Sequence, residues 1–212
     1  MTDHEHGVWF REVIAAETEA TLCALRDACL LTRFYLAGGT GLALQFGHRL
    51  SRDLDFFTEE QFNEEALIQS MQALDDFAVV SKAPYTLHAT LKETKASFLG
   101  YDYPVLFPAN LFLSVPVADP RDIACMKVSA IAGRGAKRDF VDLCVTAQRY
   151  GLFEILQLFD RKYAQARYSK VHILKSLTFF ADAEKDPMPH MLIELEWDKV
   201  KQFFLNEVPR LL

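Results

Sequence analysis

Residues 35–44 read YLAGGTGLAL and residues 49–57 read RLSRDLDFF, and these two stretches say most about the fold. The apolar run at 34–36 predicts a buried strand that stops at the pair Gly38-Gly39. A helix is predicted to follow at once, over residues 40–48. A strand that passes through a tight glycine turn into a helix predicts a mixed α/β unit.

The glycine turn has two interpretations. Because Gly38 and Gly39 carry no Cβ, the backbone can approach a ligand closely there. The free N–H groups at the start of the helix suit a phosphate, and Thr40 adds a hydroxyl donor. The same residues also suit a structural turn in which Gly39 or Thr40 caps the helix. This segment alone supports both readings equally.

The aspartate pair that follows favours the phosphate reading. Residues 54–57 predict a short strand, so Asp53 and Asp55 share one face while Leu54 points to the core. Two converging carboxylates repel each other and are costly to desolvate unless a cation lies between them. Oxygen ligands of this kind select Mg²⁺ or Mn²⁺, and Mg²⁺ completes its shell with water and phosphate oxygens. A solvated pair at a strand start is the alternative.

The remainder of the chain predicts an α+β protein in two parts. The first part, residues 1–117, combines an N-terminal helix with a mixed sheet, and the second, residues 118–212, is helical and packs on the first. The predicted helices cover residues 9–31, 62–74, 120–133, a segment from 138, 152–164, 171–180 and 197–208, and the further strands cover 77–80, 85–91, 95–99 and 111–115.

Composition narrows the class of protein. Half of the 212 residues are hydrophobic, and the formal net charge is −6. That charge argues against a broad basic surface for nucleic acid. No apolar run is long enough to span a bilayer, and the polar start at Met1–His6 does not resemble a secretory signal. We therefore expect a cytoplasmic protein without a membrane partner.

The combination of glycine turn, short helix and paired aspartates resembles the polymerase-β-like nucleotidyltransferase superfamily. Residues 35–57 look more narrowly like the first motif of the AbiEii/AbiGii toxin family. Residues 122–127, 130–131 and 134–143 look like its second block. These proteins are bacterial nucleotidyltransferases of abortive-infection and toxin–antitoxin systems. The resemblance covers most of the chain.

The resemblance implies a role for each matching residue. The nucleotide-binding set comprises Gly38, Gly39, Thr40, Arg49 and Ser51. The metal ligands are Asp53 and Asp55, which are catalytic together with the helical Lys127 and the downstream Asp139. The implied reaction moves a nucleotide from an NTP to an acceptor, which is tRNA in some members, and the implied protein partner is a cognate antitoxin.

The residues themselves give independent support to part of this assignment, and they differ from the superfamily pattern in one respect. A helical ammonium at Lys127 could neutralise a triphosphate, although a solvated lysine is the ordinary case. Asp139 sits early in a helix, where the helix dipole explains it equally well. The central strands carry no third carboxylate, since Glu93 lies between them and Asp102 beyond.

Because the third carboxylate is missing, a second hypothesis stays open. In it, the chain is a nucleotide-binding or interaction protein that kept the fold and lost catalytic turnover. An unrelated α/β domain is the remaining reading, and it requires both motif blocks to be accidental.

Overall fold

The structure, a computed structural model, describes residues 8–211. The N-terminal segment Met1–His6 therefore lies outside the described residues. Within them, no helix is long and apolar enough to cross a membrane.

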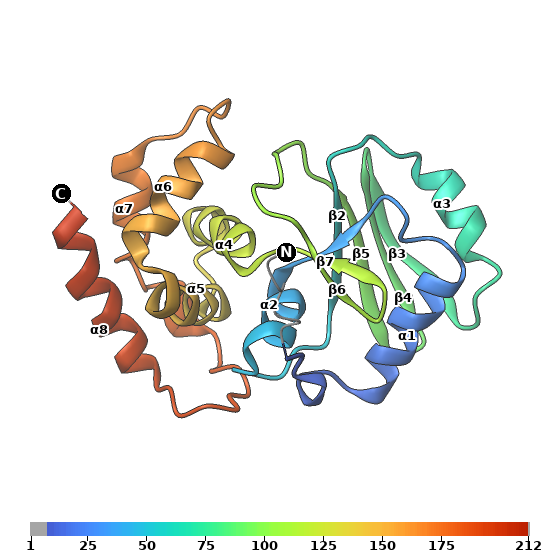
Figure 1. Ribbon diagram of the computed structural model, residues 1–212, viewed down its shortest axis with the longest axis horizontal. Helices are drawn as coiled ribbons and strands as arrows, with labels where there is room; N and C mark the ends of the chain where they lie inside the picture. Colours follow the sequence, from blue (N-terminus) through green and yellow to red (C-terminus); the bar gives the residue numbers. More distant parts are fainter. Residues whose placement is uncertain (1–7, 212) are drawn as a thin grey trace, which may run out of the picture.

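A seven-stranded mixed sheet and a group of helices lie side by side (Figure 1). The strands are β1 (Tyr35–Leu36), β2 (Leu54–Thr58), β3 (Phe77–Ala83), β4 (Thr86–Leu91), β5 (Thr94–Gly100), β6 (Asn110–Phe112) and β7 (Val115–Val117). The α-helices are α1 (Ala16–Asp27), α2 (Gly38–Phe46), α3 (Glu64–Met71), α4 (Pro120–Arg134), α5 (Lys137–Tyr150), α6 (Leu152–Lys162), α7 (Lys170–Ser176) and α8 (Trp197–Glu207).

The strand order is β3-β4-β5-β2-β1-β7-β6. β2 runs parallel to β5, and β1 runs parallel to β7, whereas the remaining neighbours are antiparallel. All seven strands come from residues 35–117, and β2 is the central strand of the sheet with β1 beside it. The predicted α+β class with a helical C-terminal region is confirmed.

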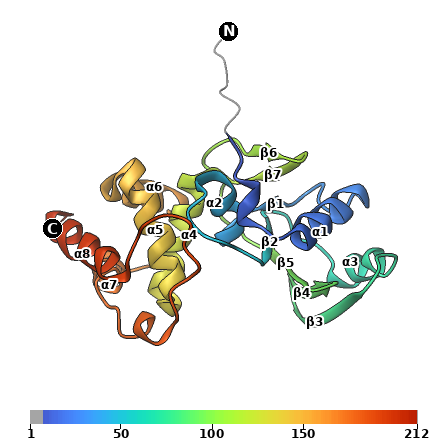
Figure 2. The ribbon, with the colours of Figure 1, turned by 90° about the horizontal axis from the view of Figure 1, so that it is seen from below.

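The two faces of the sheet have different roles. Leu54 and Phe56 of β2 point to a core shared with α1 and α3, which cover that face in Figures 1 and 2. Because side chains alternate along a strand, Asp53, Asp55 and Phe57 point to the opposite face. There Phe57 packs with residues of α2 and α4, so the aspartates face the helical half.

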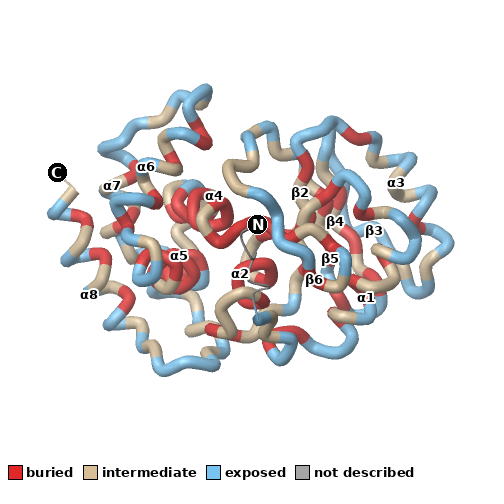
Figure 3. The backbone as a smooth tube through the Cα atoms, in the orientation of Figure 1, coloured by how far each residue is buried: buried red, intermediate tan, exposed pale blue. Residues whose placement is uncertain are grey.

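The C-terminal helices have a hydrophobic core of their own, built mainly from α4, α5, α6 and α8. Figure 3 shows buried backbone along α4 and α5, next to the sheet. Asp119 caps α4 by accepting from the backbone N–H of Arg121, and Pro120 takes the first helical position, as the sequence predicts. The domain boundary after residue 117 stays a prediction.

One strand prediction is wrong. Residues 111–115 do not form a single strand, because the chain reverses at Leu113-Ser114 and makes the hairpin of β6 and β7. Both turn residues have positive φ, 49° and 65°, as the two central positions of a type I′ turn require. The sequence has no Asn or Gly at these two positions to indicate a turn. The apolar pattern therefore predicts one continuous strand over residues 111–115.

A fully buried ion pair ties the sheet half to the helical half. Lys162 of α6 donates to Asp122 of α4 at 2.8 Å and to the carbonyl of Pro104 at 2.7 Å. Asp122 also accepts from the backbone N–H groups of Leu106 and Phe107. The loop after β5 is thereby held against α4 and α6.

Replacing Lys162 with Met should lower the free energy of unfolding by about 3–5 kcal/mol, because it strands the Asp122 carboxylate without its cation. Urea unfolding measures the change. The control is Lys170→Met, which removes an exposed pair with Asp160 and should cost at most about 1 kcal/mol. Equal effects of the two variants would contradict the structural role of the buried pair.

Candidate functional site

The paired aspartates lie where the sequence predicts, at the start of β2. Asp55 is the second residue of the strand and Asp53 directly precedes it. Both are partly exposed, while Leu54 between them is completely buried. The two carboxylates therefore share the sheet face that is turned toward α4 and α5.

The glycine turn lies against Asp55. Gly38 has a φ of +61°, and a Cβ added to it would come within 2.7 Å of Asp55 Oδ2. A Cβ on Gly39 would come within 2.2 Å of Arg49 Nη2. The turn therefore lies directly against the Asp55 carboxylate and the Arg49 guanidinium, and the positive φ of Gly38 favours glycine at that position.

Helix α2 begins at this turn without a side-chain cap. Its N-cap residue is Ala37, which has no side chain to accept from the first N–H groups. Neither Gly39 nor Thr40 is the cap, since both lie inside the helix. The N–H groups of the first turn are orphan donors of a helix, next to Asp55.

Thr40 has a different task from the one predicted. Its hydroxyl is buried, contacts Ser51 Oγ at 2.7 Å and donates to the carbonyl of Asp53. The single hydroxyl hydrogen is therefore directed into the segment that carries Asp53. Thr40 and Ser51 fix that segment on α2 through their side chains.

Arg49 makes a bidentate ion pair with Asp142 of α5. Its Nε and Nη2 donate to the two carboxylate oxygens at 2.7 and 2.8 Å, and both side chains are almost wholly buried. His48 also contacts Asp142 through Nε2, at 2.9 Å. His48 directly follows Gly47, the C-cap residue of α2.

Lys127 and Asp139 lie in the same network. Lys127 Nζ contacts Asp139 at 2.9 Å and Asp142 at 2.7 Å. Arg134 donates to the other oxygen of Asp139 at 2.8 Å. We name the six residues His48, Arg49, Lys127, Arg134, Asp139 and Asp142 the charge cluster. Asp142 is at the centre of this cluster. The sequence predicts no role for Asp142, although this residue follows Asp139 by one helical turn.

Electrostatics distinguish the carboxylates of this region. Burial raises the pKa of Asp55, and the nearby Asp53 raises it further, against the lowering effects of Ser97 and Lys127. In the charge cluster the cations outweigh burial, so the pKa of Asp142 lies well below the ordinary value. Asp142 is thus satisfied by protein cations, whereas Asp55 lacks sufficient positive charge.

The neighbouring strand has a serine beside Asp55. Ser97 of β5 is its register partner, and His88 of β4 is in turn the partner of Ser97. Glu93 lies in the turn between β4 and β5, and Asp102 follows the far end of β5. Neither acidic residue stands next to Asp55. Sheet register, which the sequence does not specify, decides this.

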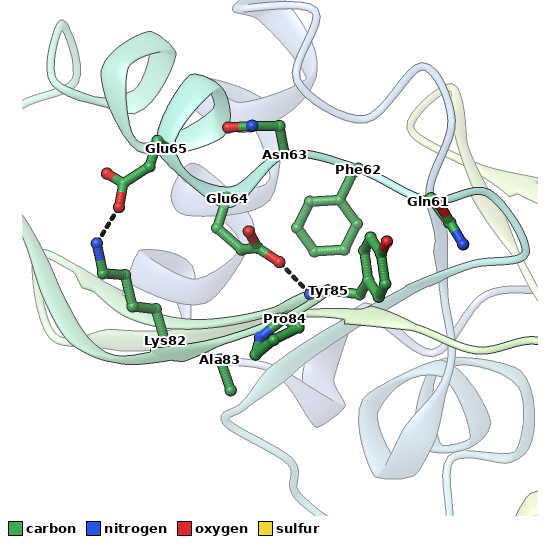
Figure 4. Close-up of a pocket in the computed structure, with 9 residues that line it drawn as sticks. All are labelled: Gln61, Phe62, Asn63, Glu64, Glu65, Lys82, Ala83, Pro84 and Tyr85. Atoms are coloured by element: carbon green, nitrogen blue, oxygen red, sulfur yellow. Dashed lines mark hydrogen bonds and ion pairs between the residues drawn. The ribbon is translucent and has the colours of Figure 1, made fainter.

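A surface hollow of about 630 Å³ lies elsewhere, between the start of α3 and the β3–β4 hairpin. Figure 4 shows Phe62 and Tyr85 facing each other there, with Glu64 accepting from the backbone of Tyr85. Glu65 and Lys82 pair at its rim. None of the predicted site residues lines this hollow.

Solved structures share this architecture. A putative nucleotidyltransferase from H. pylori matches with a TM-score of 0.53 and 17% identity, covering 92% of this chain and 95% of that one. MenT4, the nucleotidyltransferase toxin Rv2826c from Mycobacterium tuberculosis H37Rv, matches with a TM-score of 0.53 and 19% identity, covering 90% and 84%. The fold is that of polymerase-β-like nucleotidyltransferases.

The family follows from the sequence comparisons. The model described as "Nucleotidyl transferase AbiEii toxin, Type IV TA system" matches residues 21–109 and 95–210. The chain belongs to this AbiEii family, and it is a nucleotidyltransferase. The uncharacterized protein aq_aa25 of Aquifex aeolicus (strain VF5) is 39% identical over 181 residues, which cover 82% of this chain and 86% of that protein.

The Gly38→Ala variant should lose about 1–2 kcal/mol of stability, because an L-residue at this positive φ is strained, and its Cβ displaces the Asp55 carboxylate. Chemical denaturation gives the free energy of unfolding. The matched control is Gly133→Ala, in α4, where a Cβ meets nothing within 4 Å; alanine there should stabilise by up to about 1 kcal/mol. If Gly38→Ala leaves the free energy of unfolding unchanged or raises it, position 38 does not require glycine.

The Asp142→Asn variant should lose about 3–5 kcal/mol at neutral pH, because the buried cations Arg49 and Lys127 lose their shared anion. The pKa of Asp142 in the folded chain lies well below the ordinary value of 3.8. Its contribution is therefore complete above 3.8 and is lost as the pH falls below that value.

Unfolding free energies measured between about pH 3 and 7 should fall less steeply with acid for Asp142→Asn than for the unchanged chain. The exposed Asp27→Asn variant serves as control. Identical pH profiles for Asp142→Asn and the unchanged chain would show that Asp142 does not stabilise the fold through its charge.

Proposed function

We propose that the chain transfers a nucleotide from an NTP to an acceptor, with a divalent cation held by Asp53 and Asp55, as the toxin of a toxin–antitoxin pair. The observation that carries the proposal is the contact between the Gly38 turn and the Asp55 carboxylate. At this contact the turn proposed to bind phosphate and the carboxylate proposed to bind the cation lie next to each other.

Asp53 and Asp55 suit Mg²⁺ or Mn²⁺. Their oxygens are hard ligands, and the raised pKa of Asp55 reflects a buried carboxylate that a cation would stabilise in its ionised form. Within residues 8–211 no group of three or more His, Cys, Asp or Glu side chains could hold a metal. The remaining ligand positions therefore fall to water and phosphate oxygens. A bound Mg²⁺ would supply positive charge against the oxygens of the phosphate under attack.

The backbone of the glycine turn binds the phosphates in this proposal. The N–H groups of Gly38, Gly39 and Thr40 lie at the positive end of α2 and lack a side-chain cap, which suits an anion. The Thr40 and Ser51 hydroxyls act indirectly, by holding the Asp53 segment in place. Arg49 also acts indirectly. Its guanidinium lies next to Gly39 and is held there by the ion pair with Asp142.

Lys127 contributes its charge from within the charge cluster. Its ammonium lowers the pKa of Asp55, so its field reaches the aspartate pair although its hydrogen bonds go to Asp139 and Asp142. Asp139 positions Lys127 and Arg134 in this account. Arg138, which is exposed and also acts on Asp55, adds positive charge where a triphosphate would lie.

The partners proposed for the chain are an NTP, an RNA acceptor such as tRNA, and a cognate antitoxin protein. The family membership supports the antitoxin. The formal net charge of −6 favours an acceptor recognised over a small area, because a long RNA backbone needs many basic contacts.

The test incubates the purified protein with Mg²⁺, each labelled NTP and bulk tRNA. Asp53→Asn and Asp55→Asn should each slow label transfer at least a hundredfold, because loss of a cation ligand removes about 3 kcal/mol or more of charge stabilisation, at roughly 1.4 kcal/mol per tenfold. Asp27→Asn, an exposed aspartate on α1, is the matched control and should transfer label normally.

Nucleotide binding without transfer to any acceptor would favour the second candidate, a binding protein that lost turnover. The absence of a carboxylate beside Asp55 on β5 is the observation behind that candidate. Transfer that is unchanged in both aspartate variants would contradict the proposed metal site.

A further inference from the structure

A row of three polar side chains, which begins at Asp55 of the aspartate pair, crosses the sheet. Asp55 of β2 lies opposite Ser97 of β5, and Ser97 lies opposite His88 of β4. All three are partly exposed, while their neighbours Leu54, Ala96 and the other inward residues of these strands are buried. The row therefore lies on the face that carries the proposed site.

A contact with Ser97 orients the ring of His88. His88 Nδ1 lies 3.0 Å from Ser97 Oγ, and which atom donates depends on the tautomer of the ring. Ser97 lowers the pKa of the Asp55 carboxylate, which fits a hydroxyl hydrogen directed toward Asp55. In that arrangement Nδ1 is the donor to Ser97 Oγ, and Nε2 of the neutral ring holds a free lone pair.

The charged groups around His88 come from few elements. On the same face of β5 lies Lys95, and β2 contributes Asp53 and Asp55. The register partner of His88 on β3 is the uncharged Ser81. From the helical half, Lys127 and Arg138 act on Asp55. His88 thus lies at the edge of a site whose carboxylates face a cation in the proposed function.

We propose that His88 is the general base of the transfer reaction and that the acceptor atom is a neutral hydroxyl, such as a ribose hydroxyl of RNA. The proposal rests on the proposed function. A hydroxyl must lose its proton as it attacks, whereas a phosphate acceptor is already ionised and needs no base. Ser97 is a positioning residue, since it orients the ring through Nδ1.

The step balances as follows. The hydroxyl oxygen of the acceptor forms a bond to the α-phosphorus of the NTP while its O–H bond breaks and the proton moves to His88 Nε2. The bond from the α-phosphorus to the bridging oxygen breaks, and pyrophosphate leaves with the electron pair. The imidazolium then returns its proton to water.

The variant that tests the role is His88→Asn, because an asparagine amide can still donate to Ser97 Oγ in place of Nδ1 but offers no base. It should lower kcat by about 10²–10⁴-fold, with the KM for NTP and the unfolding curve unchanged. If His88 takes up the proton, the unchanged enzyme should lose activity toward acidic pH and His88→Asn should not show that loss. Added imidazole should restore part of the activity of His88→Ala. Thr90→Ala, on the same face of β4 two residues away, is the control and should keep full activity.

The outcomes separate the two proposals. If Asp55→Asn abolishes transfer while His88→Asn keeps full kcat and an unchanged pH profile, the role of His88 is overturned and the proposed function stands. If the label is found on a phosphate oxygen of the acceptor, the inference of a hydroxyl acceptor is overturned. If no NTP is transferred to any acceptor, both proposals fall.

Discussion

The buried carboxylate of Asp142 is the interaction on which the arrangement of the site depends. It accepts from Arg49 and His48, which precede β2, and contacts Lys127 of α4. A carboxylate without solvent is costly unless its charge is matched and its oxygens are hydrogen-bonded. Asp142 meets both conditions only when the segment before β2 lies against α4 and α5, so its burial selects one relative placement of sheet and helices.

The segment from His48 to Asp53 is held from several sides as a result. Its backbone pairs with residues His190 and Leu192 of the C-terminal region, and Thr40 of α2 holds the carbonyl of Asp53. Such redundancy matters because the aspartate pair stands at the first residues of a strand, where the backbone has few ladder bonds. The charge cluster thereby fixes the segment that leads into Asp53 and Asp55.

Two environments for carboxylates follow within one small region. Protein cations surround Asp142 and Asp139 and lower the pKa of each, whereas burial and Asp53 raise the pKa of Asp55. A group whose charge the protein leaves incompletely balanced is suited to a ligand that brings the missing charge. The charges of Asp139 and Asp142 are thus balanced within the protein, whereas that of Asp55 is not.

The local sequence determined the elements around the site, because each depends on residues close together in the chain. The glycine turn, the alternation of Asp53-Leu54-Asp55 and the capped start of α4 at Asp119-Pro120 were all predictable. The reversal at Leu113-Ser114 was not, because neither Leu nor Ser favours the positive φ that both residues adopt there. The tertiary structure alone decided which side chains meet: Ser97 and His88 beside Asp55 through strand register, and Arg49, Lys127 and Asp142 through burial of charge. These pairings join residues between 9 and 94 positions apart, and no local pattern specifies them, since register and charge pairing are set only when the whole chain packs.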